Sequence, residues 1–156
     1  MMARSRIRQK TTRVEHRLSA TIETAKFSYF IAGHEISRTS TRVDDEAIIE
    51  VVARIAQIEP PQPERIGQSI DCAFVTARSF ASEGELKAGR PLLLRVNLRR
   101  GQNSMLAYLP EDAFWALQHR FGRKEISTLE ITYQAPIRGS TDLSSIYLAE
   151  VPGAQA

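Results

Sequence analysis

The sequence predicts a mainly β protein, folded as a single-domain antiparallel barrel or sandwich with one short helix. Seven to nine short segments alternate apolar and polar residues, as strands with one buried face do. One further segment carries an apolar stripe at helical spacing. The strand segments follow one another closely, without the strand–helix alternation that is typical of a parallel α/β sheet.

The first strands are predicted from the region after the N-terminal bases. An alternation of apolar and polar residues begins at Arg17 and continues through Ile22, which indicates a half-buried strand. Residues 26–32 (KFSYFIA) are aromatic and β-branched and are followed by glycine, so we expect a second strand there. Phe27 and Tyr29 fall on its apolar side and are expected in the core.

Residues 46–58 fit two kinds of element. Apolar residues recur there at helical spacing, and Asp44 is available as a helix N-cap. However, six of the thirteen residues are Ile or Val, and the odd positions from 47 to 55 are all apolar, as in a strand that faces a core. We expect a strand and keep a second helix as the alternative. Residues 34–43 fit a short strand or a loop.

The second half of the chain has a more regular pattern. A tight turn at residues 100–103 is expected to join two strands as a hairpin. The helix is expected at about 110–121, because Pro110 favours a first turn and Gly122 favours a stop. The remaining predicted strands are residues 69–78, 91–99, 104–109, 127–134 and 142–150.

Positive charge is concentrated at the N-terminus. The chain of 156 residues has a formal net charge of +3 and a pI of about 9.3. Residues 1–17 carry six bases and one acid, whereas the other 139 residues carry 15 bases and 17 acids. We therefore expect a flexible basic arm at 1–15, one globular domain at 16–151 and a tail at 152–156.

Composition narrows the class of protein. Hydrophobic residues make up 42% and charged residues 25% of the chain, which favours a globular domain over a disordered chain. No apolar run approaches the ~20 residues of a membrane-spanning helix, and no apolar segment follows the N-terminal bases as in a secretory signal. A single cysteine excludes an internal disulfide and fits a reducing compartment, so a cytoplasmic location is expected.

No motif predicts a reaction, a metal site or a cofactor. The histidines at 16, 34 and 119 are not spaced as metal ligands with one another or with Cys72. Cys72 lies on the apolar side of its predicted strand, where a thiol is buried and inert. We expect a non-catalytic domain. A site assembled from distant strands around His34 or His119 is the enzymatic alternative.

Two arginine pairs share one spacing. Arg13 and Arg17 form an R-x-x-x-R immediately before a predicted strand, and Arg4 and Arg8 repeat it. This resembles the first half of the PilZ cyclic-di-GMP signature, in which paired guanidiniums grip phosphate and guanine edges. The resemblance covers five residues. Its second half, D-x-S-x-x-G, is absent, because residues 35–40 lack both the Asp and the Gly, so the sequence does not assign the family.

Two kinds of partner fit these features. Another protein is the first hypothesis, because Trp115 lies off the apolar stripe of its helix and a partly exposed Trp is a good anchor. DNA or RNA is the alternative, because a basic arm and outward strand arginines neutralise phosphates. No membrane partner is expected. The candidate contact residues for either partner are Arg4, Arg6, Arg8, Lys10, Arg13, Arg17, Arg95, Arg99, Arg100 and Trp115.

Overall fold

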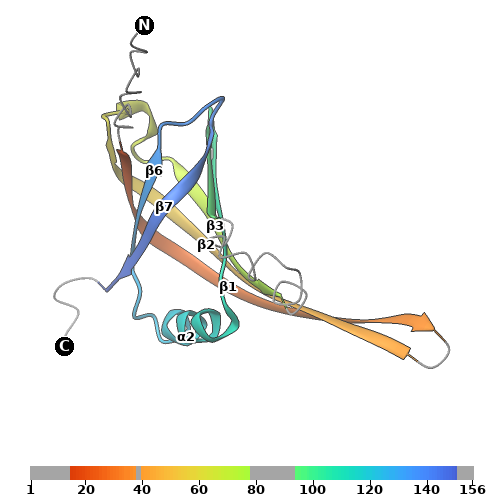
Figure 1. Cartoon of the computed structure of the whole chain (residues 1–156). Coiled ribbons are helices and arrows are strands. Elements are labelled where there is room, and N and C mark those ends of the chain that lie inside the picture. The colour runs from red at the N-terminus through yellow and green to blue at the C-terminus, as the bar shows by residue number, and fades with distance from the viewer. Residues whose placement is uncertain (1–14, 38–39, 78–93, 151–156) are drawn as a thin grey trace, which may run out of the picture.

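The described part of the chain forms a closed seven-stranded β-barrel with one α-helix across one end (Figure 1). A computed structural model describes residues 15–37, 40–77 and 94–150; within them, the side chains of 34–44 and 94 are not described. The elements are β1 (Glu15–Ser37), β2 (Ser40–Glu59), the 3₁₀ turn η1 (Pro63–Arg65), β3 (Ser69–Ala77), β4 (Leu94–Arg99), β5 (Gln102–Tyr108), α2 (Glu111–Gly122), β6 (Thr128–Gln134) and β7 (Ser140–Ala149).

The predicted mainly β class is confirmed, and the barrel rather than the sandwich is observed. The strands follow one another around the barrel in the order β1-β2-β3-β5-β4-β7-β6. All neighbouring pairs are antiparallel except β3 and β5, so the expected all-antiparallel pairing is wrong at this one ladder. These two strands run in the same direction because β4, which separates them in sequence, lies on the far side of β5.

The two strands predicted at 17–22 and 26–32 are a single strand, β1. Its ladder with β2 is irregular between Ile22 and Thr24, where one extra residue enters β1. A bulge of this kind changes which side chains face the core. The inward positions therefore shift from Leu18 and Ala20 to the odd-numbered residues that follow the bulge, which interrupts the alternation in the sequence.

The second helix considered for 46–58 is wrong, because these residues lie within β2. Their odd positions face the barrel interior, and five consecutive ones are at most 3% exposed: Ala47, Ile49, Val51, Ala53 and Ile55. Six β-branched residues in this stretch favour the extended backbone. The strand interpretation is therefore confirmed.

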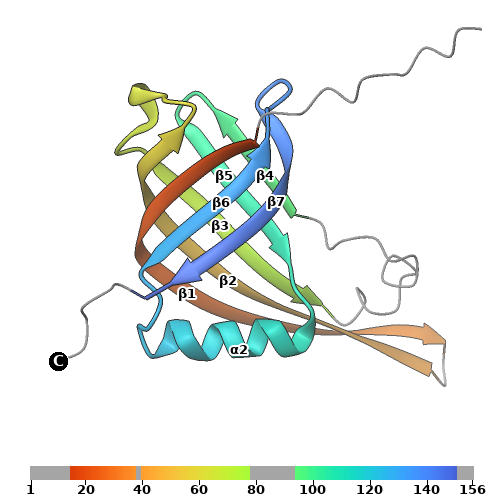
Figure 2. The same ribbon diagram turned by 60° about the vertical axis from the view of Figure 1, so that its left-hand side comes forward.

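The first two strands extend beyond the barrel as a two-stranded ribbon (Figures 1 and 2). β1 pairs with β6 only from Glu15 to Thr21, and β2 pairs with β3 only from Glu46 to Arg54. The pairing between β1 and β2 continues as far as Ser37 and Ser40. We call residues 28–37 of β1 and their partners 40–48 of β2 the projecting hairpin; residues 46–48 at its base still pair with β3.

The helix closes the barrel end from which this hairpin leaves (Figure 2). Glu111–Gly122 agrees with the predicted helix at about 110–121. Phe114 is fully buried against the barrel core, and Leu117 and Phe121 pack on the core from its edge, as the apolar stripe predicts. Among the described residues, no helix has the length and apolarity to span a membrane. The largest core side chains are Tyr133, Phe74, Phe114, Leu18, Ile49, Ile55, Ile70, Leu129 and Ile131.

Candidate functional site

Four exposed apolar side chains are gathered where the projecting hairpin leaves the barrel. Trp115 of α2 is 39% exposed, and Phe27, Tyr29 and Ile31 of β1 are 40%, 46% and 58% exposed. The Trp115 ring centroid lies 5.6 Å from that of Phe27 and 6.1 Å from that of Tyr29, within the range of interacting aromatic pairs. We call Phe27, Tyr29, Ile31 and Trp115 the aromatic surface.

The position of this surface follows from the bulge in β1. Phe27 and Tyr29 lie opposite Ile49 and Ala47 of β2, both of which are buried in the barrel. They thus lie on the core-facing side of β1, as the sequence indicates. The prediction that they belong to the core is nevertheless wrong, because β1 has here passed the end of its ladder with β6, and both rings remain partly exposed beside Trp115 of α2.

Helix α2 holds Trp115 in place through its neighbour in sequence. Phe114 is 0% exposed and meets Trp115 edge to face, with 5.3 Å between ring centroids and an interplanar angle of 88°. Successive helical residues point about 100° apart, so burial of Phe114 turns Trp115 toward β1. The predicted partial exposure of Trp115 is confirmed.

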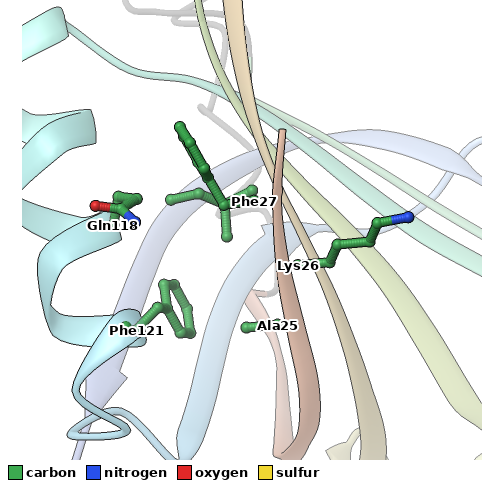
Figure 3. A pocket seen from close by; sticks show the side chains of 7 residues that line it. Ala25, Lys26, Phe27, Gln118 and Phe121 are labelled. Carbon is green, nitrogen blue, oxygen red and sulfur yellow. The ribbon is translucent and has the colours of Figure 1, made fainter. Parts of the chain in front are cut away.

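A small pocket lies beside this surface, between β1 and the C-terminal half of α2 (Figure 3). Its volume is about 80 Å³. Small-molecule sites are several times larger, typically about 300–1,000 Å³, so this dent suits one apolar side chain rather than a cofactor. Its lining residues are Ala25, Lys26, Phe27, Ile49, Gln118, Phe121 and Gly122.

Acidic groups border the aromatic surface. Asp45 accepts a hydrogen bond from the Tyr29 hydroxyl at 3.0 Å. Glu111 and Asp112 are exposed in the first turn of α2, and Glu111 precedes Trp115 by four residues, which places both on one helix face. The Lys26 side chain points to the side of β1 away from α2 (Figure 3). Negative charge at this border disfavours a phosphate backbone and is compatible with a protein partner.

The arginines predicted to contact nucleic acid lie away from this surface. Arg99 and Arg100 are exposed at the β4–β5 turn. β5 runs from this turn to α2 over seven residues, a span of roughly 20 Å. The turn and Trp115 therefore lie at opposite ends of the barrel (Figure 2), so the candidates that the structure describes do not form one site.

The other predicted basic residues differ in their placement. Arg95 is exposed on β4, as predicted for its outward face, and its cross-strand neighbour is Asp142. Arg17 lies at the start of β1 with its Nε 3.3 Å from Glu130. The candidates Arg4, Arg6, Arg8, Lys10 and Arg13 lie outside the described residues, as do most of the predicted arm and the tail.

The groups considered for catalysis are dispersed. Cys72 is 2% exposed, as predicted, and burial raises the pKa of its thiol to about 12, with a smaller contribution from Asp71. The His16 ring packs on buried Tyr133 at 5.5 Å, and His119 is exposed on α2, whereas the His34 side chain is not described. Within the described ranges, no group of three or more His, Cys, Asp or Glu residues could hold a metal ion.

Sequence analysis did not identify a polar cluster at the opposite barrel end. The Arg65 guanidinium donates to Gln62 Oε1 at 2.6 Å and to Asn103 Oδ1 at 2.7 Å. Asn103, only 4% exposed, donates in turn to Gln68 Oε1 at 3.0 Å and to the Ser69 carbonyl at 3.1 Å. These bonds fix the β2–β3 connection over the start of β5. Nothing in the spacing of these residues indicates that they meet.

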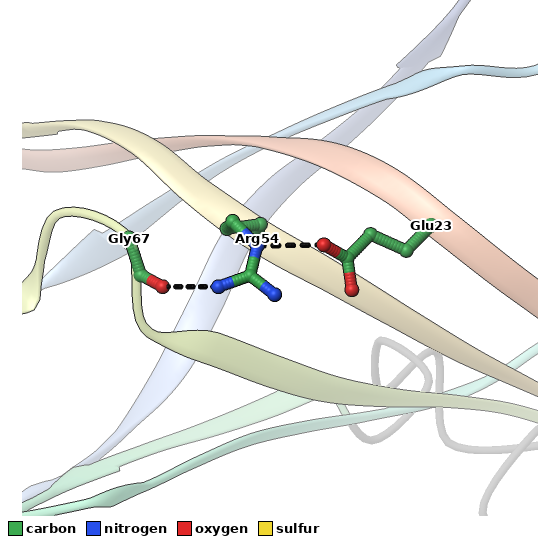
Figure 4. A network of polar contacts seen from close by, with 3 residues as sticks. All are labelled: Glu23, Arg54 and Gly67. Atoms are coloured by element: carbon green, nitrogen blue, oxygen red, sulfur yellow. Dashed lines mark hydrogen bonds and ion pairs between the residues drawn. The ribbon is translucent and has the colours of Figure 1, made fainter.

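A second arginine fixes the same connection from outside the barrel (Figure 4). Arg54 of β2 lies 2.6 Å from Glu23 of β1 and donates to the Gly67 carbonyl at 2.8 Å. Glu23 is the extra residue of the bulge in β1. The contact therefore links the irregular part of β1, strand β2 and the following loop, and we assign it a structural role.

Comparison of the chain with protein-family models, with curated proteins and with solved structures finds no match. The resemblance of residues 13–17 to half of the PilZ signature therefore stays limited to five residues, and no family is assigned.

Proposed function

We propose that the protein is a non-catalytic binding domain that docks another protein on its aromatic surface. The observation that carries the proposal is the partial exposure of Phe27, Tyr29 and Trp115, at 39–46%, in one cluster of ring contacts. Contiguous exposed apolar groups mark interaction surfaces, and Trp and Tyr are enriched among the residues that dominate binding energy.

Two further features support a protein partner. The small pocket beside Phe27 can receive an apolar side chain, which is how interface anchors are commonly held. The acidic groups Asp45, Glu111 and Asp112 oppose the approach of phosphates and favour partner segments that carry Lys or Arg.

A site-specific photo-crosslinking experiment tests this proposal. A photoreactive amino acid replaces Trp115 in one variant and Ile137 in a matched control, and both variants are irradiated in cells that naturally make the protein. Ile137 is apolar and 79% exposed in the β6–β7 connection, at the barrel end opposite α2. A discrete protein adduct from position 115 alone is expected. The same adducts from both positions, or none from position 115, would refute the proposal.

The sole tryptophan provides an independent readout. Because the chain contains one Trp, its fluorescence reports on the aromatic surface alone. The partner protein that crosslinking identifies is then purified and titrated into the wild type. Trp115 should become less exposed, and its fluorescence emission should shift to shorter wavelength. An unchanged spectrum at saturation would place the partner elsewhere.

Association with DNA or RNA is the second candidate function, and it is favoured by the position of the strand arginines. Arg99 and Arg100 are exposed at the barrel end where β1 begins at Glu15 (Figure 2). Glu15 directly follows residues 1–14 in the sequence, which include five basic residues. Arg99 and Arg100, which are adjacent in sequence and both exposed, can neutralise phosphates together.

This alternative is tested by deleting residues 1–14 or by replacing Arg95, Arg99 and Arg100 with Glu. Either change should abolish binding to DNA or RNA at low salt, and Trp115→Ala, at the other barrel end, is the matched control. Binding that survives both changes rules out the alternative.

A further inference from the structure

The outer edge of the projecting hairpin has no strand beside it in the described structure. β1 pairs with β6 up to Thr21, and the Ile22 N–H then donates to the Ser127 carbonyl at 2.8 Å. From Glu23 to Ser37, β1 has a ladder partner on its β2 side only, among the described residues. Backbone N–H and C=O groups along such an edge are a template for another strand.

Between the bulge at Ile22–Thr24 and Gly33, this edge has little of the usual protection against pairing. Natural edge strands carry prolines, bulges or several charges, or are very short. Between Thr24 and Gly33 the sequence has no proline and a single charge, Lys26. The ladder with β2 is regular over the same stretch, and Phe30 and Ile31 are 65% and 58% exposed. A long, regular, apolar edge of this kind favours a permanent partner strand.

We propose that the partner is a second copy of this chain, paired antiparallel through the same edge about a two-fold axis at Phe30. Residues directly opposite each other in an antiparallel pair have their side chains on the same face of the sheet, and side chains alternate between faces along each strand. When the two strands are identical and related by a two-fold axis, one residue must therefore lie opposite its own copy. With Phe30 at the centre, Tyr29 lies opposite the partner's Ile31, and Ser28 lies opposite the partner's Ala32.

This register is self-complementary. Tyr29 of each copy meets Ile31 of the other, so this pair occurs twice. It brings an aromatic ring beside a β-branched residue, which is a favourable cross-strand combination. Phe30 meets its own copy on the opposite face. A register centred on Tyr29 instead sets Phe30, the most exposed of these side chains, opposite the partner's Ser28, and so pairs it with a polar residue. Because the contact is isologous, it closes on itself and gives a dimer, not a fibre.

The inference goes beyond the proposed docking function, because it rests on the backbone edge of β1 and on Phe30, which lies on the face of β1 opposite to Phe27 and Tyr29. From the aromatic surface it uses only the contact of Tyr29 with the partner copy's Ile31. In the dimer, both aromatic surfaces lie on the same face of one continuous sheet. The assembly would therefore present its docking surface twice, which strengthens binding to a partner with two matching sites.

Disulfide trapping tests the register directly. In the proposed dimer the two Phe30 Cα atoms lie about 4.5–5.5 Å apart, within the range that a disulfide spans. Phe30→Cys should form a covalent dimer under mild oxidation, without interference from the buried Cys72, the single native cysteine. The matched control Lys26→Cys should not form one. In this register the two residues at position 26 lie eight positions apart along the paired strands, a distance of about 27 Å. Absence of a Phe30→Cys dimer, or equal trapping of both variants, overturns the proposal.

Charge substitution tests the same axis without covalent chemistry. Wild-type protein should sediment with twice the monomer mass at about 100 µM, a concentration chosen because the interface is small. Phe30→Glu and Phe30→Lys should each halve that mass, since each sets like charges opposite each other at the axis. Mixing the two variants should restore it. A wild-type monomer, or a mixture that stays monomeric, refutes pairing at Phe30.

Discussion

Cys72 should make the barrel lose stability at alkaline pH. The thiol lies on the inner face of β3, and burial, aided by the charge of Asp71, raises its pKa from 9.0 to about 12. Because the pKa is higher in the folded chain, the thiol stabilises the fold fully below pH 9, and this contribution is lost as the pH rises toward 12. At about pH 10, ionisation of Cys72 in the unfolded chain should lower the free energy of unfolding by about 1.4 kcal/mol.

Urea denaturation of the wild type and Cys72→Ala, at about pH 7 and pH 10, measures this loss. The alanine variant carries a packing cost of about 1 kcal/mol at both pH values, so only the difference between its two values matters. The wild type should lose about 1.4 kcal/mol more than Cys72→Ala between the two pH values. Equal losses would show that the thiol is not held protonated by the fold, and would reopen a reactive role for it.

Three further substitutions test the packing of the barrel itself, each by the same urea denaturation. Tyr133→Phe should stabilise the barrel by about 1 kcal/mol, because it removes a buried hydroxyl that has no hydrogen-bond partner in the described structure. Arg65→Met should cost about 2 kcal/mol, because Asn103 loses a charged donor while buried; no change would show that the cluster contributes nothing. Gly139→Ala should cost about 1–2 kcal/mol, because φ is +79° and a Cβ would lie 3.0 Å from the Leu98 carbonyl oxygen. An unchanged free energy of unfolding for Gly139→Ala would mean that the turn adjusts its backbone without strain.

Much of the barrel could be predicted from local pattern. The alternation in β3, β4 and β6 assigns their buried faces correctly, as Ile70, Val96 and Leu129 show, and Pro110 and Gly122 bracket the helix. These elements each keep one face toward a single core, so a period of two or of 3.6 residues is sufficient to identify them.

The pattern fails where an element has more than one environment. β1 contains a bulge, so its inward side changes from even to odd positions, and the sequence is then read as two strands. In the candidate site, Phe27 and Tyr29 have the composition and phase of core residues. Only the extension of β1 beyond the barrel exposes them, and that depends on where β6 ends.

The sequence by itself determined the β class, the helix at about 110–121, the partial exposure of Trp115 and the buried thiol, because each depends on neighbours within one or two turns of chain. The tertiary structure alone decided that the barrel closes, that β3 and β5 run parallel and that Phe27 and Tyr29 reach Trp115. These contacts join segments dozens of residues apart. They depend on how all seven strands share one core, a constraint that no local periodicity contains.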